Sequence, residues 1–245
     1  MSEMSLITVE GHTLCPRYID ANSVVLDVGA NLGNFSRLMA DRFGCQCHAV
    51  EANPAVCARI PAHARIVTHR LAVAGRNGQV RLRIHEDDEC SSLSPIPGEP
   101  YVNELDVPAL TLERLADKLN LKLIDVLKMD IEGSEIEVLN ACSDEFLGRI
   151  AQLTLEIHDF TGQVSKSQAN ALLDRLRRAG FFVIKMARKS HIDTLAINRR
   201  RVSISSLELV YFRYVVRNWH GLKRMVGRWL GAAPPPNARP ARQPT

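Results

Sequence analysis

The sequence is short of aromatic residues, of regularly spaced cysteines and of long apolar runs. Aromatic side chains make up 5% of the 245 residues, and the six cysteines are irregularly spaced. This spacing excludes a zinc ribbon and a secreted disulfide framework, so we expect reduced thiols. No apolar run reaches the roughly 18–20 residues of a membrane span, and no basic region followed by an apolar stretch opens the chain. We therefore expect a cytoplasmic protein that does not span a membrane.

Acidic and basic residues are unevenly distributed along the chain. The whole sequence is 46% apolar and 24% charged with a net charge of +4, which is typical of a folded globular protein. From Arg199 to Thr245 there are ten basic residues and one acidic residue, a net charge of +9. The preceding 198 residues carry a net charge of −5. The sequence thus predicts an acidic body with a basic C-terminal end.

Short apolar runs alternate with segments of helical periodicity. Short, wholly apolar strands between helices are typical of a parallel sheet covered on both faces, so the sequence predicts an α/β fold with a doubly wound sheet. The expected strands are residues 24–28, 47–50, 65–68, 124–129, 153–157 and 181–184. The expected helices are residues 35–43, one starting at Asn53-Pro54, residues 111–119, one after Gly133, and residues 166–179.

Two segments interrupt this alternation. Residues 71–84 contain the turn cluster Gly75-Arg76-Asn77-Gly78 between two extended runs, which predicts a hairpin. Residues 85–108 are rich in acidic residues, Ser, Pro and Gly. Since this stretch is too polar for the core, we expect a long loop that acts as a lid.

The first predicted strand leads into the turn Asp27-Val28-Gly29-Ala30-Asn31-Leu32-Gly33. Ligands of doubly wound sheets bind at the carboxyl ends of the strands. Gly29 and Gly33 let the backbone turn sharply and approach a ligand, and Asn31 tolerates a positive φ angle. The alternative is that the glycines serve only a tight turn.

A carboxylate follows the second strand at the place where adenosine cofactors bind. Glu51 lies 22 residues after Gly29, where it can accept hydrogen bonds from two ribose hydroxyls. Dinucleotide-binding turns have a glycine where this chain has Asn31, so a cofactor without phosphates is favoured. The predicted cofactor-binding residues are Asp27, Gly29, Ala30, Asn31, Gly33, Glu51, Ala52 and Asn53.

Three segments carry a family resemblance. They are the turn at residues 27–33, Glu51-Ala52-Asn53-Pro54, and Asp125-Val126-Leu127-Lys128-Met129-Asp130-Ile131-Glu132-Gly133-Ser134-Glu135 with Val138-Leu139 after it. Over residues 24–184 the chain resembles the FkbM-type methyltransferases, a branch of the class I S-adenosylmethionine-dependent enzymes. The Lys-x-Asp-x-Glu-Gly segment is the most distinctive motif.

The resemblance implies a Rossmann-like, mostly parallel, seven-stranded sheet with helices on both faces and an antiparallel last strand, expected near residues 207–212. It implies S-adenosylmethionine as the cofactor, with its methionine part at residues 29–33 and its ribose on Glu51. It also implies O-methylation of a sugar, polyketide or similar compound. Between residues 90 and 108 only Ser91-Ser92-Leu93 is family-like, so contacts to the acceptor are not carried over.

Titratable side chains follow the fourth and fifth predicted strands. Asp130 and Glu132 come after the fourth strand, and Glu156 and His158 come at the end of the fifth, so all four are expected near the transferred methyl group. We predict that His158 is the general base, because the usual histidine pKa of about 6.5 suits proton acceptance at neutral pH. Asp130 is expected to position the acceptor or the cofactor's amino group.

Other roles are open for these residues. Glu132 can cap the helix that follows it, because acids favour the positive field at a helix N-terminus. His158 can simply hydrogen-bond a neighbouring loop. Asp130, Glu156 and His158 together can also bind Mg²⁺ or a similar divalent ion, although a site without metal is our main prediction.

The remaining histidines and a strand lysine are expected to have structural roles. Lys128 lies inside an apolar strand, where pairing with an acid or extension to the strand edge is expected. Surface or packing positions are expected for His12, His48, His63, His69, His85, His191 and His220.

The predicted organisation is an N-terminal extension (residues 1–23), a methyltransferase domain (residues 24–213), a basic amphipathic helix (residues 214–230) and a proline-rich disordered tail (residues 231–245). In the helix, apolar residues recur at three- and four-residue steps and arginines lie on another face. It either packs on the domain or on a second subunit of a homodimer, or binds the inner face of a membrane peripherally. Nucleic acid is not favoured, because stacking aromatic residues across a sheet are missing.

The sequence therefore predicts an enzyme that uses S-adenosylmethionine to methylate a hydroxyl of a small molecule or glycan. A cofactor-binding scaffold without catalysis is the main alternative. An RNA-modifying methyltransferase is the third hypothesis.

Overall fold

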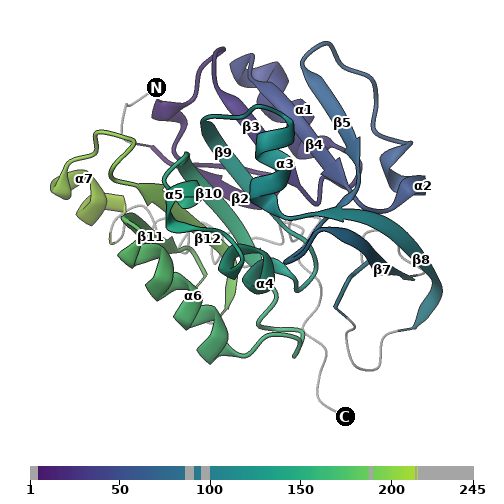
Figure 1. The fold of residues 1–245 in the computed structure, drawn as a ribbon. Helices are drawn as coiled ribbons and strands as arrows, with labels where there is room; N and C mark the ends of the chain where they lie inside the picture. Colours follow the sequence, from purple (N-terminus) through teal and green to yellow (C-terminus); the bar gives the residue numbers. More distant parts are fainter. Residues whose placement is uncertain (1–4, 86–90, 95–99, 188–189, 213, 215–245) are drawn as a thin grey trace, which may run out of the picture.

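A seven-stranded sheet forms the centre of the molecule (Figure 1). The computed structural model describes residues 5–85, 91–94, 100–187, 190–212 and 214. In this sheet the strand order is β11-β12-β10-β9-β3-β4-β5, and β12 runs antiparallel to both of its neighbours. The strands are β3 (Val24–Val28), β4 (Gln46–Glu51), β5 (Ile66–Arg70), β9 (Ile124–Met129), β10 (Ile150–Ile157), β11 (Phe181–Lys185) and β12 (His191–Asn198). The predicted mostly parallel sheet with an antiparallel last strand is confirmed.

The position predicted for that last strand was wrong. Residues 206–211 form a helix, α7 (Ser206–Tyr211), and the antiparallel strand is β12. The local sequence explains the helix: the Ser205 side chain accepts the Glu208 backbone N–H, and the Glu208 side chain in turn accepts the Ser205 N–H. This reciprocal capping starts a helix where apolar content alone suggested a strand.

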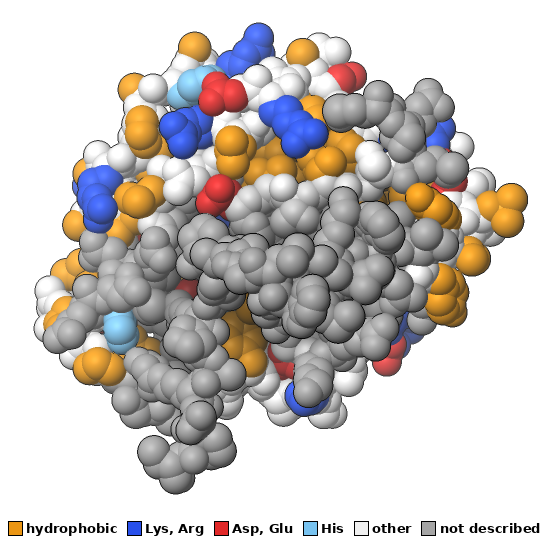
Figure 2. Space-filling model, turned by 180° about the vertical axis from the view of Figure 1, so that it is seen from behind, with side chains coloured by type: hydrophobic (Ala, Val, Ile, Leu, Met, Phe, Trp, Pro, Cys, Tyr) orange, Lys and Arg blue, Asp and Glu red, His pale blue; other side chains and the backbone are white. Residues whose placement is uncertain are grey.

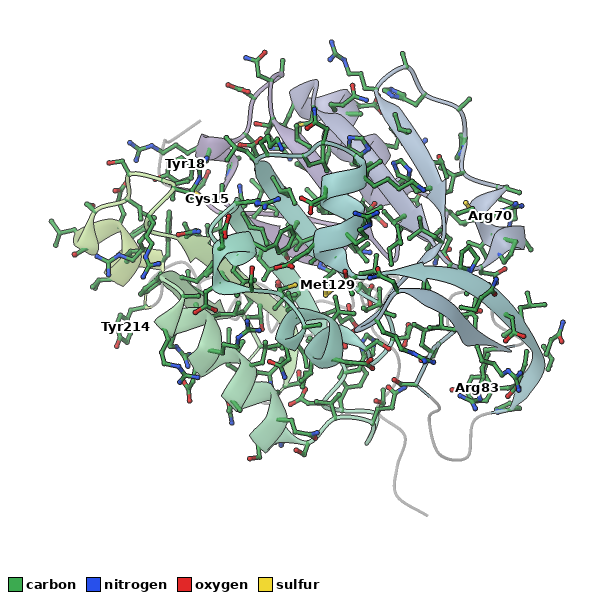
Figure 3. The ribbon with its side chains drawn as sticks, in the orientation of Figure 1. Cys15, Tyr18, Arg70, Arg83, Met129 and Tyr214 are labelled. Atoms are coloured by element: carbon green, nitrogen blue, oxygen red, sulfur yellow. The ribbon has the colours of Figure 1, made fainter. Side chains whose placement is uncertain are left out.

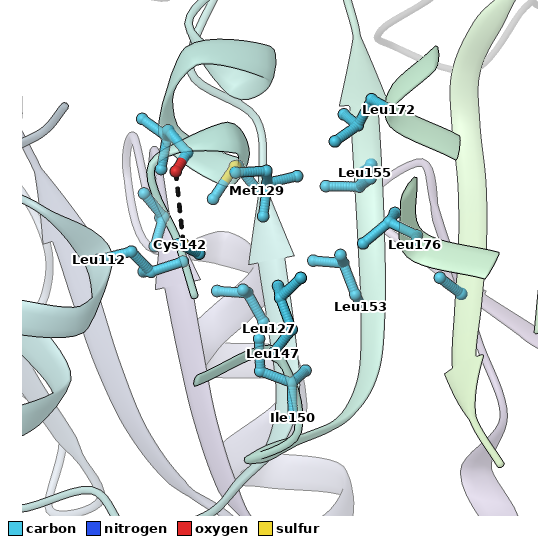
Figure 4. Close-up of a cluster of buried hydrophobic side chains, with 14 of the residues drawn as sticks. Leu112, Leu127, Met129, Cys142, Leu147, Ile150, Leu153, Leu155, Leu172 and Leu176 are labelled. Atoms are coloured by element: carbon cyan, nitrogen blue, oxygen red, sulfur yellow. Dashed lines mark hydrogen bonds between the residues drawn. The ribbon is translucent and has the colours of Figure 1, made fainter. Parts of the chain in front are cut away.

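Helices cover both faces of the sheet, as predicted. Val25 and Val126 pack with α1 residues, whereas the next residues along these strands, Leu26 and Leu127, belong to a second core with the later helices (Figure 4). Successive strand residues point to opposite faces, so the two cores lie on opposite sides. The helices are α1 (Asn34–Phe43), α2 (Pro54–Cys57), α3 (Leu112–Lys118), α4 (Glu135–Asn140), α5 (Asp144–Leu147) and α6 (Lys166–Arg178), with a 3₁₀ turn at Pro16–Tyr18.

Residues 71–110 form a second, three-stranded sheet that extends beyond β5 at the right of Figure 1. Its strands are β6 (Ala72–Val73), β7 (Gly78–His85) and β8 (Tyr101–Leu110), with β8 in the middle. The predicted hairpin within residues 71–84 is therefore wrong, and so is the prediction that residues 85–108 are loop throughout. In β8 alternate residues such as Val107 and Ala109 are buried, which supports a strand even though much of the sequence is polar.

A short N-terminal hairpin packs against the main sheet. Its strands β1 (Ile7–Val9) and β2 (His12–Leu14) pair antiparallel, and β2 contacts β10 and β12. The Asp193 carboxylate of β12 accepts hydrogen bonds from the Thr13 backbone N–H at 3.1 Å and from Thr13 Oγ1 at 2.7 Å. This contact fixes β2 against β12 of the main sheet.

The structure also bears on the predictions about the cysteines and membrane spans, whereas most of the C-terminal end lies outside the described residues. Within the described residues, five buried cysteines are free thiols, namely Cys15, Cys45, Cys47, Cys57 and Cys142. No helix in the described part of the chain is long and apolar enough to cross a membrane. The predicted tail at residues 231–245, and all of the predicted basic helix except Tyr214, lie outside the described residues. From behind, charged and hydrophobic side chains are interspersed over the part of the surface that is described (Figure 2).

We expect Thr13→Val to lower the free energy of unfolding by about 1–3 kcal/mol, because the buried Asp193 oxygen loses its hydroxyl donor. Chemical denaturation followed by circular dichroism measures this change. Thr8→Val, at an exposed position of the same hairpin, is the matched control and should leave stability nearly unchanged. Equal stabilities of the two variants would contradict the anchoring role of Thr13.

Candidate functional site

A pocket lies at the carboxyl ends of β3, β4 and β9. Of the predicted cofactor-binding residues, Gly29, Asn31, Glu51 and Ala52 line it, together with Asp130 and Glu132 of the predicted catalytic set. Asp27, Ala30, Gly33 and Asn53 are not among the lining residues. The structure therefore brings the first turn, the end of β4 and the Asp130 loop to one place.

The turn after β3 has the backbone conformation expected of it. Gly29, Asn31 and Gly33 have φ angles of +78°, +50° and +74°. A Cβ atom on Gly29 would lie 1.7 Å from the Asp130 carbonyl oxygen, and one on Gly33 would lie 2.7 Å from Ile60 Cγ2. Neighbouring segments of the protein therefore approach these two glycines closely. From the sequence we had expected a ligand to make this close approach.

Asp27 lies beneath this turn and has a supporting position. Its fully buried carboxylate accepts a hydrogen bond from Ser36 Oγ at 2.8 Å and lies 3.3 Å from Lys128 Nζ. Lys128 Nζ also donates to the Gly29 carbonyl at 2.6 Å. The predicted pairing of Lys128 with an acid is confirmed, and the pair holds the Gly29 turn from below.

Glu51 and its neighbours are arranged to accept hydrogen bonds from a ligand. One Glu51 carboxylate oxygen accepts the Asn31 backbone N–H at 2.9 Å, and the other accepts the Asn53 N–H at 2.8 Å. Each oxygen keeps a further lone pair. Asn31 Oδ1 is buried without a hydrogen-bond partner among the described residues. Burial raises the pKa of Glu51 above its usual value, and these backbone N–H groups counteract the effect.

The four predicted catalytic side chains come together around one imidazole. His158 follows β10, and only 2% of its side chain is exposed. Its Nε2 lies 3.2 Å from Glu132 Oε2, 3.8 Å from Asp130 Oδ1 and 3.9 Å from Glu156 Oε1. The prediction that the ends of β9 and β10 converge is confirmed.

Glu135 belongs to this group and was not predicted. Its fully buried Oε1 lies 3.0 Å from His158 Nδ1 and also accepts the backbone N–H groups of Ile131 and Gly133. Glu135 therefore stabilises the start of α4. From the sequence we had considered Glu132 as a cap of this helix. Its place in the first turn of the helix after the Lys-x-Asp-x-Glu-Gly segment was the available signal. We call His158, Asp130, Glu132, Glu135 and Glu156 the His158 cluster.

His12 also lies beside this cluster, in a buried position edge-on to Phe35, which confirms the packing position predicted for it. It comes from β2, is 2% exposed, and places Nε2 3.8 Å from Asp130 Oδ2. Lys128 Nζ lies 4.0 Å from the same oxygen. No spacing in the sequence connects His12 with Asp130, because the N-terminal hairpin reaches the site only through tertiary packing.

The cluster sets the protonation of its members. Burial by itself would lower the pKa of His158, but the negative charges of Glu135 and Glu132 and their hydrogen bonds outweigh burial and hold that pKa well above its usual value. Burial would raise the pKa of Asp130, but Lys128, His12 and His158 keep it well below its usual value. For Glu156, burial and the charge of Asp130 raise the pKa to about 8. These shifts favour the charged form of His158 and the protonated form of Glu156 at neutral pH.

Both ring nitrogens of His158 face a carboxylate oxygen, since Nδ1 lies 3.0 Å from Glu135 and Nε2 lies 3.2 Å from Glu132. The role of His158 as general base stays a prediction, and the site offers Glu156 as a second candidate. Glu156 has the pKa that suits proton exchange near neutrality.

Within the described part of the chain, two overlapping groups of side chains have the spacing of metal ligands. His12, Asp130 and Glu156 form one, and Asp130, Glu132 and His158 form the other, with ligand atoms within 4.8 Å of one another. Carboxylate and imidazole ligands suit a divalent ion. Lys128 Nζ and His158 Nε2 also lie within 4.0 Å of Asp130, and the expectation of a site without metal stays a prediction.

The segment 91–94 connects the two halves of the site. Asn53 Nδ2 donates to Ser91 Oγ at 3.3 Å, and Ser92 Oγ lies 2.6 Å from the Glu132 carbonyl oxygen. Gln163 Nε2 donates to the Ser94 carbonyl at 2.6 Å. Within the predicted lid, these residues lie against the site, while residues 86–90 and 95–99 lie outside the described residues.

Comparison with known proteins adds a family match. The family model described as Methyltransferase FkbM domain matches residues 27–183. AMB antimetabolite synthetase AmbE of Pseudomonas aeruginosa is 39% identical over 72 residues, which are 29% of this chain. The chain matches only 3% of the length of that curated relative.

Solved structures of low sequence identity also resemble the chain. A Methanococcus jannaschii fibrillarin pre-rRNA processing protein has 11% identity and a TM-score of 0.47, over 79% of this chain and 70% of that chain. TrmK of M. capricolum, in complex with the cofactor product S-adenosyl-homocysteine, has 12% identity and a TM-score of 0.43, over 89% of this chain and 85% of that chain.

We expect Glu135→Gln to lower the pKa of His158, because the substitution removes the nearest negative charge from its Nδ1 atom. The imidazole NMR signals of His158, followed against pH, measure the change. Glu137→Gln, at an exposed position of the same helix, should leave the titration unaltered. A His158 titration that is the same in the Glu135 variant and the wild type would refute this charge coupling.

Proposed function

This chain belongs to the FkbM methyltransferase family, and from that premise we propose that it methylates a hydroxyl group of a small molecule or glycan. Family membership makes it an S-adenosylmethionine-dependent methyltransferase. One observation carries the proposal: Glu156, a carboxyl with a pKa of about 8, lies in the cluster at the edge of the cofactor pocket. A hydroxyl acceptor loses a proton during transfer, and an adjacent group must take it.

The pocket residues fit S-adenosylmethionine. Glu51 offers two carboxylate oxygens that suit a pair of ribose hydroxyls, and the unpartnered Asn31 Oδ1 offers a further acceptor. When bound, this cofactor supplies an electrophilic methyl group. The turn at Gly29 provides a backbone cradle for it, held in place from below by Asp27 and Lys128.

In the proposed reaction Glu156 is the general base. As its carboxylate, it takes the proton of the acceptor hydroxyl, and S-adenosylmethionine held by Glu51 and the Gly29 turn would supply the methyl group to the acceptor oxygen. Asp130, ionised at neutral pH because of its cationic neighbours, accepts a hydrogen bond from the cofactor's ammonium group or from the acceptor. His158 acts as a fixed cation that holds Glu132 and Glu135 in place. Much of the rate enhancement then comes from positioning.

The acceptor class is supported by two further points. The Pseudomonas aeruginosa relative is an antimetabolite synthetase, which favours a small-molecule acceptor. The body of the protein up to residue 198 has a net charge of −5, which disfavours an RNA acceptor. A screen of sugars and polyketides with methyl-labelled cofactor tests this proposal. Cofactor binding without a product from any acceptor would support the scaffold alternative, and methylated RNA would support the third hypothesis.

We expect Glu51→Gln to weaken the binding of S-adenosylmethionine by about 10–100-fold, because a charged hydrogen-bond acceptor is worth roughly 1.5–3 kcal/mol. Isothermal titration calorimetry measures the dissociation constant. Glu145→Gln, at an exposed position of α5, should bind as the wild type does. An unchanged affinity in a correctly folded Glu51 variant would rule out the ribose contact.

We expect the rate of methyl transfer to rise with pH through about 8, as the Glu156 carboxyl loses its proton. Glu156→Gln should reduce kcat by about 10²–10⁴-fold and remove this limb of the profile. A pH–rate profile of both proteins, at saturating cofactor and acceptor, measures the effect. Retention of the limb in the variant would exclude Glu156 as the base.

A stability measurement checks that the Glu156 variant is folded. The folded-state pKa lies above the ordinary value of 4.5, so the native state binds the additional proton between these two values and stability falls as pH rises through that window. Glu156→Gln removes the ionisable group and therefore this loss of stability at high pH. Its melting temperature at pH 8 should therefore equal or exceed that of the wild type.

A further inference from the structure

The outer face of α7 exposes large apolar side chains. Leu207 is 83% exposed, Val210 53%, Tyr211 36% and Tyr214 59%. They are four of the nine large apolar side chains that are exposed among the described residues. Their spacing in the sequence places them on one side of the helix. We call these four residues the α7 stripe.

The stripe is held on the body of the protein by its opposite face. Leu209 and Phe212 are buried, and Phe212 packs in a core cluster with Ile184 and Leu195. Arg17 forms an ion pair with Glu208, and the Tyr18 hydroxyl donates to the Ser203 carbonyl at 2.7 Å. The stripe therefore belongs to an anchored helix.

The figures place this stripe at one side of the molecule. Figure 3 shows Tyr214 and Tyr18 on the same side as α7. In Figure 2, which turns the molecule by 180°, hydrophobic side chains gather at the right-hand edge, where α7 lies. The second, three-stranded sheet lies at the opposite side in Figure 1.

Basic residues come shortly before the stripe in the sequence. Arg199, Arg200 and Arg201 are exposed just before α7. A groove beside the helix is lined by Arg17, Tyr18, Arg201 and Ser203, and also by Asp20 and Asp125. The two aspartates accept hydrogen bonds from the backbone N–H groups of Asn22 and Val24. Beyond α7 the sequence adds further arginines, and residues 199–245 have a net charge of +9.

We propose that the α7 stripe and the arginines beside it form a docking surface for a bilayer of anionic lipid. Apolar side chains enter the boundary between headgroups and acyl chains, and arginines around them are attracted to the negative surface. The proposal does not depend on the acceptor of the methyl group.

A second copy of the chain fits this surface less well than a lipid bilayer. In a symmetric dimer the same patch is present on both subunits. Arg199, Arg200 and Arg201 of one copy would then face, or lie close to, those of the other, and like charges across an interface are unfavourable. An anionic bilayer supplies the opposite charge.

Docking in this way fixes the orientation of the enzyme. The groove lies where the parallel strands begin, since Ser23, Asp125 and Ala151 line it at the starts of β3, β9 and β10. The cofactor pocket and the His158 cluster lie at the opposite, carboxyl edge of the sheet. A docked molecule therefore turns its pocket away from the bilayer and takes its acceptor from the aqueous phase.

Sedimentation of the full-length protein with vesicles tests the proposal. We expect binding to phosphatidylcholine vesicles that contain phosphatidylserine, and binding at least about tenfold weaker without the anionic lipid. The variant Leu207→Ser/Val210→Ser/Tyr214→Ser should lose binding about tenfold or more, and Arg199→Glu/Arg201→Glu should lose most of the dependence on phosphatidylserine. Val102→Ser/Leu123→Ser replaces residues that are 57% and 46% exposed elsewhere and should bind as the wild type does.

Two outcomes would overturn the proposal. Sedimentation of the stripe variant equal to that of the wild type would show that the stripe does not contact lipid. Absence of vesicle binding, with a dimer that the stripe variant dissociates in light-scattering measurements, would assign the stripe to a second copy of the chain. Unchanged melting temperature and unchanged affinity for S-adenosylmethionine in the variants establish that they are folded.

Discussion

Four carboxylates share one largely buried imidazole, and the organisation of the active site depends on how their charges are balanced. Carboxylates withdrawn from water must be paired or protonated. Here His158 pairs with Glu132 and Glu135, Lys128 pairs with Asp27 and lies near Asp130, and Glu156 is left to hold a proton. The same arrangement that satisfies burial thus produces one carboxyl that exchanges its proton near neutral pH.

The fold brings these groups together because parallel strands end at one edge. β3 supplies the Gly29 turn, β4 supplies Glu51, and the ends of β9 and β10 together with the start of α4 supply the cluster. The Asp27–Lys128 pair beneath the turn connects the Gly29 turn with β9, because Lys128 contacts both Asp27 and the Gly29 carbonyl oxygen. The pocket and the His158 cluster are therefore parts of one packed structure, and the contact of the Asp130 carbonyl with Gly29 leaves no room for a side chain there.

Local patterns in the sequence predicted much of this, and long-range packing accounts for the rest. The ends of apolar strands identified Glu51, Asp130, Glu156 and His158, because strand direction alone determines their edge. His12 arrives through a hairpin that is far from the others in sequence. β8 was not predicted as a strand because many of its side chains are polar and exposed. Residues 207–212 were predicted as a strand from their apolar residues, but a capping box at Ser205 and Glu208 starts the helix α7 there. The proton balance of the cluster also depends on the distances between its members, which residue type alone does not give.

The central claim is that Glu156 is a neutral acid at pH 7 beside His158, whose charged form is stabilised by Glu132 and Glu135. Infrared difference spectroscopy of the full-length protein between pH 5 and pH 9, with Glu156→Gln used to assign the band, tests it directly. The account predicts a protonated carboxyl band from Glu156 that persists at neutral pH and disappears near pH 8. A Glu156 carboxylate that is already ionised at pH 6 would contradict it.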